Sequence, residues 1–120
     1  AAMIGTALLR TPEADINPAW ATALARAQPE DTTLTRAFSG RTARALVNAY
    51  TRAADHPAAP TPAPYPVQRH LTDPMRRKAL ESQEFDHLYA LSGQAAALAR
   101  AEPAGSIATR LWDDARRLLA

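Results

Sequence analysis

The sequence predicts a mainly helical chain with one or two short strands. Alanine, the strongest helix former, supplies 29 of the 120 residues, and apolar residues recur at helical spacing in several segments. The ten prolines, against four glycines, are typical start and stop signals of short helices. A chain of 120 residues forms at most one domain with a modest core, or part of a larger unit.

Composition excludes several classes of protein. The absence of cysteine rules out a disulfide framework and a thiolate metal site. No apolar run approaches the roughly 18 residues of a membrane span, and no secretion leader is recognisable, so we expect a cytoplasmic protein without a membrane partner. The pI is 9.5, but the net charge is only +2 and acidic residues are scattered among the arginines, so we expect no nucleic-acid partner.

The first residues have the character of a buried strand. Ala1 to Ile4 is an apolar run, and Gly5-Thr6 then predicts a turn with close backbone approach. No other segment offers a strand of this kind, and an unpaired apolar strand is costly to expose. We therefore expect its neighbouring strands to be encoded elsewhere.

A helix and an extended segment are predicted next. Asn17-Pro18 is a cap followed by proline at the first helical position, which predicts a helix over 18–27. Trp20 lies on its apolar stripe, which favours packing over a role as a stacking platform. Thr32 to Phe38 alternates and is rich in threonine, as in a short strand or extended segment.

An arginine-rich helix is expected after Ser39-Gly40. Its apolar residues fall at helical spacing: Ala43, Leu46, Val47, Tyr50 and Ala54. Arg41 would lie near the positive end of the helix dipole, which is unfavourable for a cation. Either an acidic or phosphate partner lies nearby or Arg41 is a surface residue, and spacing leaves both open.

Prolines divide the second half. His56 to Gln68 contains too many prolines for a helix and is expected to be an extended connector. Asp73-Pro74 should open a helix through about Ser82, followed by an apolar turn with Phe85, Leu88 and Tyr89. Gly93-Gln94 should start an alanine helix ending at Pro103. Ser106 should cap a last helix with a buried stripe of Ile107, Leu111, Ala115 and Leu118.

No constellation of residues carries chemistry by itself. The three histidines, His56, His70 and His87, have no partners at metal-ligand spacing, so we expect no metal site. No nucleophile elbow, glycine-rich phosphate loop or zinc-protease motif occurs.

Four blocks in register resemble a known family. They are IGTALLRTPEA (4–14), LTRAFSGRTARALVN (34–48), YPVQRHLTDPMRRKA (65–79) and LSGQAAALAR (91–100). Their order and approximate spacing are similar to the C-terminal third of nitronate monooxygenases, formerly called 2-nitropropane dioxygenases. The resemblance implies a (β/α)8 TIM barrel that binds FMN at the carboxyl ends of its strands and oxidises alkyl nitronates with molecular oxygen.

The resemblance also assigns expected cofactor-binding residues. Gly5 and Thr6 match the turn after the last barrel strand, where relatives bind the flavin phosphate, in agreement with the usual phosphate site of such barrels. Ser92, Gly93 and Gln94 match a turn beside the flavin, with Tyr89 nearby, although Leu91 stands where relatives often have an aromatic residue. No catalytic residue is expected in this chain, because none of its histidines matches the family's base.

The resemblance divides the chain into four parts. Residues 1–11 would be the last strand and phosphate turn, 12–55 a helix, an extended segment and the arginine-rich helix, 56–72 the connector, and 73–120 the C-terminal helices. We expect an incomplete oxidoreductase that is inactive alone. Its expected partners are the rest of the barrel, a nitronate and O2, and a homo-oligomer with a second copy of the chain is a further possibility. A fragment of an enoyl-reductase-like flavin barrel and a stand-alone helical interaction module remain alternatives.

Overall fold

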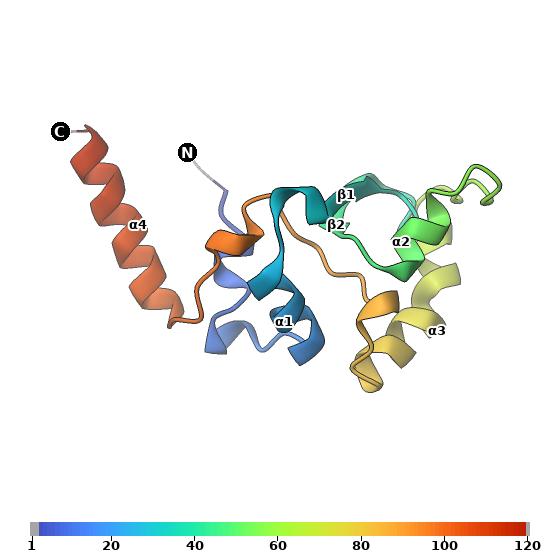
Figure 1. The fold of residues 1–120 in the computed structure, drawn as a ribbon, viewed down its shortest axis with the longest axis horizontal. Helices are drawn as coiled ribbons and strands as arrows, with labels where there is room; N and C mark the ends of the chain where they lie inside the picture. Colours follow the sequence, from blue (N-terminus) through green and yellow to red (C-terminus); the bar gives the residue numbers. More distant parts are fainter. Residues whose placement is uncertain (1–2, 120) are drawn as a thin grey trace.

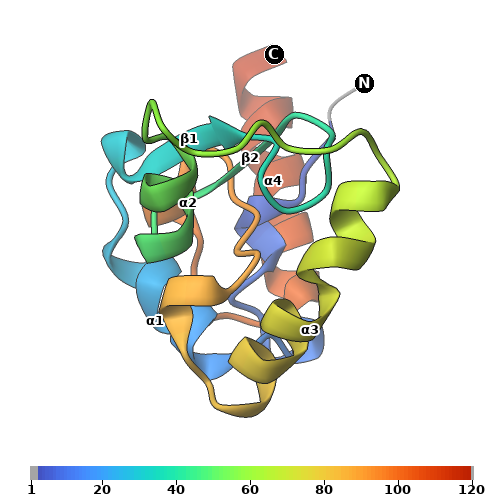
Figure 2. The same ribbon diagram turned by 90° about the vertical axis from the view of Figure 1, so that its right-hand side faces the viewer.

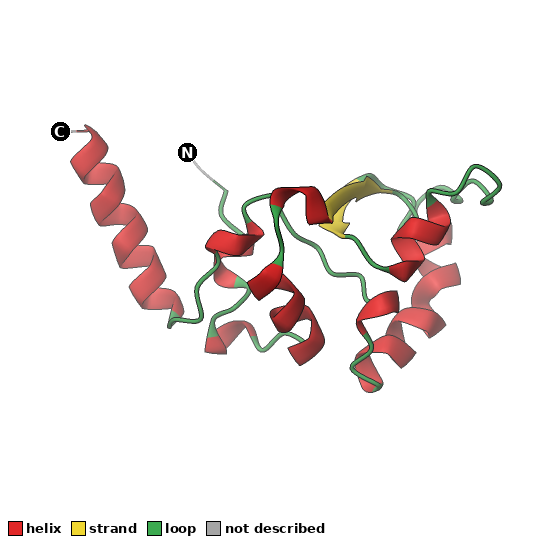
Figure 3. Ribbon diagram, in the orientation of Figure 1, coloured by secondary structure: helices red, strands yellow, loops and turns green. Residues whose placement is uncertain are grey.

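The computed structural model describes residues 3–119, which form a mainly helical chain with two short antiparallel strands. This agrees with the predicted fold class. The described residues contain one two-stranded ribbon of sheet, which lies near the upper edge of the view in Figure 3 with helices beside and below it. The molecule is elongated, 52 × 29 × 25 Å, with its C-terminal helix projecting at one end (Figure 1).

The expected N-terminal strand is not formed in the described residues. Ala1 and Ala2 lie outside the described part, and Met3 and Ile4 have no regular structure. Met3 is fully exposed, and the 3-10 helix η1 (Thr6–Leu8) begins directly after Gly5. A strand needs a partner for its backbone groups, and the described residues offer none here.

Helix α1 (Pro18–Arg26) confirms the predicted first helix. The Asn17 side chain accepts a hydrogen bond from the Ala19 amide, and Pro18 occupies the first turn. Its apolar face supplies Leu24, completely buried, to a core cluster that also contains Ala27, Leu46, Ala79, Leu88, Ala90 and Ala96. Trp20 packs against this cluster, as its spacing predicts.

The sheet is a two-stranded ribbon. Strand β1 (Thr32–Thr35) pairs antiparallel with β2 (Ala43–Leu46), with Thr32 opposite Leu46 and Thr35 opposite Ala43. Threonine-rich β1 lies within the predicted extended segment. The prediction of an arginine-rich helix after Ser39-Gly40 is wrong over residues 41–48. Pairing with β1 and a hydrogen bond from the Leu46 amide to the Ala90 carbonyl fix an extended backbone there.

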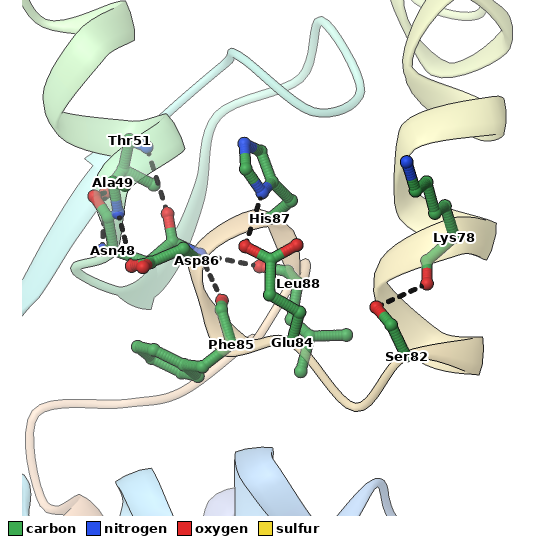
Figure 4. A network of polar contacts seen from close by, with 10 residues as sticks. All are labelled: Asn48, Ala49, Thr51, Lys78, Ser82, Glu84, Phe85, Asp86, His87 and Leu88. Atoms are coloured by element: carbon green, nitrogen blue, oxygen red, sulfur yellow. Dashed lines mark hydrogen bonds and ion pairs between the residues drawn. The ribbon is translucent and has the colours of Figure 1, made fainter.

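Helix α2 (Ala49–Ala54) begins about two turns later than expected, and Asn48 is its cap. The buried Asn48 side chain accepts from the Thr51 amide at 3.0 Å. Its amide group also donates to the carbonyls of Phe85 (3.1 Å) and Leu88 (2.9 Å) (Figure 4). The residue that starts α2 therefore also holds the 3-10 helix η4 (Phe85–His87) in place.

The connector is shorter than expected, and helix α3 (Val67–Glu81) begins before Asp73-Pro74. Pro74 lies inside α3, where it removes one backbone hydrogen bond. The turns ahead of Pro74 are fixed by tertiary contacts, because the Thr72 hydroxyl donates to the Phe38 carbonyl at 2.7 Å and the Gln68 side-chain amide donates to the Ala37 carbonyl at 2.6 Å. These bonds account for a helix that proline propensity alone does not predict.

The prediction of an alanine helix after Gly93-Gln94 is wrong. Its residues form only the 3-10 helix η5 (Ala96–Leu98) between irregular segments. The Arg10 side chain donates to the Ala99 carbonyl at 2.8 Å, and the Gly93 amide donates to Thr6, so contacts with the N-terminal segment replace helical bonds. Tertiary bonding overrides the helix propensity of alanine here.

Helix α4 (Ala104–Leu119) is amphipathic but mostly unpartnered. It starts before Ser106, which is therefore not its cap, and of the expected buried stripe only Ile107 is buried. Leu118 is 88% exposed and Trp112 66%, because the helix extends away from the body of the molecule (Figures 1 and 2). In residues 3–119, none of the helices is both long and apolar enough for a membrane span.

Candidate functional site

The two segments expected to bind a flavin meet in space. The Gly93 amide donates a hydrogen bond to the Thr6 hydroxyl oxygen at 2.9 Å, across 87 residues of sequence. A Cβ added to Gly93 would lie 3.4 Å from that oxygen, at the edge of ordinary van der Waals contact. The hydrogen bond from its backbone amide therefore brings the turn that follows Ser92 against the N-terminal turn.

Two further bonds fasten these segments together. Arg10 donates to the Ala99 carbonyl, and the Glu13 carboxylate accepts from the Ala104 amide at 3.0 Å. Residues 6–13 and 93–104 therefore form one structural unit, although most of the chain lies between them. This unit also receives the start of α4, whose Ile107 is buried.

A cleft of about 680 Å³ opens between this unit and α4. Four of the six expected cofactor-binding residues line it: Gly5, Thr6, Gly93 and Gln94. Much of its remaining wall is apolar, from Met3, Ile4, Leu98 and Leu111, which are all exposed. Thr6 accepts one hydrogen bond, and the described residues show no acceptor for its hydroxyl proton, which stays available to a ligand in the cleft.

The other two expected residues have different surroundings. Ser92 is 5% exposed, its hydroxyl donates to the Gly93 carbonyl at 2.9 Å, and its amide donates to the Arg44 carbonyl of β2. Ser92 therefore anchors the turn on the sheet and does not line the cleft. An isolated bridge between Ala45 and Leu91 continues this anchoring.

Tyr89 belongs to an aromatic stack behind the turn. Its ring lies 4.5 Å from that of Phe38 at an interplanar angle of 19°, and Phe38 in turn contacts Tyr50 at 4.8 Å. Phe38 is 1% exposed, so the stack is a second small core between the sheet, α2 and the residues before the turn. Tyr89 does not line the cleft within residues 3–119.

Two arginines of the cleft were not anticipated from the sequence. Arg100 and Arg110 line it, and both contact Glu102, Arg100 at 3.6 Å and Arg110 through a short hydrogen bond. The hydrogen bond from Arg110 lowers the pKa of the Glu102 carboxyl, with the charges of both arginines adding to the effect. Because one carboxylate contacts two guanidinium groups, the net charge of this group of three side chains is positive. Their spacing in the sequence carries no recognisable signal.

The arginines of the segment 34–48 are structural. Arg36 donates to the Gly40 carbonyl at 3.0 Å and Arg44 to the Thr32 hydroxyl at 3.0 Å. The Arg41 guanidinium lies 3.8 Å above the Tyr65 ring. Within the described residues none of the three forms an ion pair. Arg41 is exposed, as in the surface alternative considered for it, and its neighbour is an aromatic ring.

The histidines form no catalytic or metal-binding group in the part of the chain that the structure describes. No cluster of three metal-ligating side chains occurs there. His87 pairs with Glu84 at 2.8 Å on the surface, and the His56 ring accepts from the Ala58 amide (Figure 4 shows the former pair). None of the three lines the cleft.

Comparisons with known proteins match the whole chain. The model of a family described as nitronate monooxygenase matches residues 1–114. The nitronate monooxygenase of Paraburkholderia phytofirmans is 36% identical over 111 residues, which cover 92% of this chain and 30% of that protein. The one from Pseudomonas aeruginosa is 34% identical over 116 residues, 97% of this chain and 33% of the relative.

A solved structure gives the same result. The nitroalkane oxidase of Streptomyces ansochromogenes superimposes with a TM-score of 0.86 at 37% identity, covering 100% of this chain and 35% of that one. The chain therefore spans about a third of the length of the proteins that it matches.

Proposed function

Because the chain belongs to the nitronate monooxygenase family, we propose that it supplies the C-terminal part of an FMN-dependent enzyme that oxidises alkyl nitronates with molecular oxygen. In this proposal a longer polypeptide, or a second chain, provides the rest of a (β/α)8 barrel. The 120 residues by themselves are then inactive, and no catalytic group comes from them.

The observation that carries this proposal is the cleft between the N-terminal turn and the turn at Gly93. Gly5-Thr6 and Gly93-Gln94 are far apart in sequence, and their contact through the Gly93 amide and the Thr6 hydroxyl makes them one wall of the same cleft. Phosphate sites of (β/α)8 barrels lie in the loops after the last strands, which is the position that Gly5-Thr6 would have after a strand over 1–4.

The residues present fit the phosphate end of FMN. A Cβ added at Gly5 would have no neighbour within 4 Å, so the backbone there is open to a ligand. The Thr6 hydroxyl can donate to a phosphate oxygen while it accepts from Gly93. Arg100 and Arg110 give this cleft the positive charge that a phosphate requires. When bound, FMN supplies the electron transfer between nitronate and oxygen.

The exposed apolar residues around the cleft and on α4 support the part of the proposal that a further barrel segment covers this face. Met3, Ile4, Leu98 and Leu111 are exposed around the cleft, and α4 presents further apolar residues beyond it. A helix that follows a barrel strand normally packs against the outside of the barrel. The uncovered face of α4 and the unpaired segment at Met3 are the surfaces that such a barrel would bury.

Complementation tests the proposal. The chain is co-expressed with the first two thirds of one of the relatives named above, and the purified complex is examined for flavin absorbance, cofactor mass and nitronate-dependent oxygen uptake. We expect a yellow complex that contains FMN and consumes oxygen with a nitronate. NAD(P)H-dependent reduction of an enoyl thioester, without oxygen uptake, would support the enoyl-reductase alternative and contradict the proposal.

Variants of Thr6 test the role of the cleft. Thr6→Val removes the hydroxyl and keeps the shape of the side chain, so FMN affinity of the complex should fall about tenfold, the effect of one charge-assisted hydrogen bond. Thr6→Ser retains the hydroxyl and should retain binding. Equal FMN affinity in both variants would show that the N-terminal turn does not bind the cofactor.

A further inference from the structure

A second cavity lies at the other end of the molecule. It has a volume of about 420 Å³, opens to solvent, and is lined by α2, the connector, α3 and Ala37. It shares no lining residue with the cleft at Gly5 and Gly93. In Figure 1 these elements lie at the end opposite to the N- and C-termini.

The cavity exists because its walls carry small side chains. Alanines face it from three segments: Ala37 after β1, Ala53 and Ala54 of α2, and Ala59 and Ala63 of the connector. Leu71 of α3 contributes the largest aliphatic side chain. Its volume lies within the range of small-molecule sites, about 300–1,000 Å³, and its lining is predominantly apolar, as such sites are.

Two of the three polar side chains in the wall, Tyr50 and Gln68, are bonded to backbone groups, and the third is Thr61. Both the Tyr50 hydroxyl (3.2 Å) and the Gln68 side-chain amide (2.6 Å) donate to the Ala37 carbonyl. The Gln68 side-chain oxygen accepts from the Ala63 amide at 3.0 Å. Within the described residues no charged side chain lines the cavity, so a charged ligand would lose hydration without gaining a counter-charge.

The wall is fixed before a ligand arrives. Gly40 has a φ of +85° and lies so close to the connector that a Cβ there would be 2.4 Å from the Ala63 oxygen. The connector therefore rests on the turn between β1 and β2 at Ala63, beside the Gln68 bond. Burial raises the pKa of Tyr50, as expected for a phenol in apolar surroundings.

We propose that this cavity is a binding site for a compact, neutral and largely apolar molecule, separate from the cleft and independent of flavin binding. The anionic nitronate does not fit this chemistry, because the wall offers no cation to it. A neutral molecule of aromatic or short aliphatic character does.

The alanines allow a direct test. Alanine methyl groups of the protein, in the form in which it purifies, are labelled with carbon-13 and observed by NMR while benzene is added. We expect saturable ring-current shifts at Ala53, Ala54, Ala59 and Ala63, and none at Ala97, which lines the cleft. Benzoate, which has the same ring with a negative charge, should produce no such shifts.

Two leucine substitutions provide the comparison. Ala54→Leu fills the cavity from α2, and benzene affinity should fall at least tenfold. Ala25→Leu makes the same change on the exposed side of α1 and should leave binding unaltered. If Ala54→Leu disturbs folding, as judged from methyl signals outside the cavity, Ala59→Leu fills the site from the connector.

Three results would overturn the proposal. Shifts that grow linearly without saturation would indicate general solvent partitioning. Equal shifts at Ala97 would show that benzene does not select this cavity. Unchanged benzene affinity in the filled variant would show that the molecule binds elsewhere.

Discussion

Gly40 should be the position in the turn between β1 and β2 that tolerates substitution least. Its φ of +85° lies in the left-handed region, where a residue with a Cβ is strained. A Cβ there would lie 2.4 Å from the Ala63 oxygen, 2.6 Å from the Tyr65 nitrogen and 2.8 Å from the Pro64 carbonyl carbon. All three are backbone atoms, so the connector itself must move in Gly40→Ala.

The magnitude follows from two terms. The left-handed backbone costs a residue with a Cβ about 1–2 kcal/mol. Overpacking against neighbours that cannot rotate away typically costs about 1–3 kcal/mol. Displacing the connector also weakens the bond between Ala63 and Gln68 and the contact of Arg41 with Tyr65. We therefore expect Gly40→Ala to lower the free energy of unfolding by about 2–5 kcal/mol.

Urea unfolding of the purified protein measures this loss, and Gly105→Ala is the matched control. Gly105 lies in α4, and a Cβ there would meet nothing within 4 Å, so alanine should leave stability unchanged or raise it by about 0.5–1 kcal/mol. If Gly40→Ala unfolds at the same urea concentration as Gly105→Ala, the close contact with the connector is not present and the reasoning is wrong.

Three further substitutions test other contacts. Asn48→Ala removes a cap and leaves two buried carbonyls without their donor, so urea unfolding should report a loss of about 2–4 kcal/mol, and a loss below about 0.5 kcal/mol would contradict the network. Arg110 lowers the pKa of Glu102, so the carboxylate stabilises the fold at pH values above 4.5, its pKa in the unfolded chain. This contribution disappears as the pH falls through the folded pKa. Thermal melts of Glu102→Gln should therefore differ from those of the parent at neutral pH and coincide with them in acid. Burial raises the pKa of Tyr50, so the parent should lose stability as pH rises above 10.0, where the unfolded chain ionises first; thermal melts of Tyr50→Phe on both sides of that pH should lack this loss.

Local signals were sufficient where they were strong and close in sequence. Asn17-Pro18 predicted the start of α1, and the threonine-rich run predicted an extended segment that contains β1. The same reasoning failed over 41–48, where helical spacing of apolar residues coincided with a strand fixed by its distant partner. Asn48, the actual cap of α2, is a residue type favoured at helix starts and so carried a local signal for the true start of this helix.

The candidate site depended on a family pattern more than on composition. The contact between Thr6 and Gly93 joins residues 87 positions apart, and no periodicity predicts it. Ser92 belongs to the same block as Gly93 and Tyr89 lies just before it, yet Ser92 anchors the turn and Tyr89 packs against Phe38. Arg100 and Arg110 reach the cleft from separate segments, so only the folded chain brings them together.

The contact between the turns at Thr6 and Gly93 closes the chain between them into one long loop. The backbone leaves one point, forms the sheet, α2 and α3, and returns to the same point before α4 begins. Residues can be inserted into or deleted from such a loop without altering the distance between its two ends. Related chains can therefore vary in the segment between Thr6 and Gly93 while the junction of the two turns keeps its dimensions.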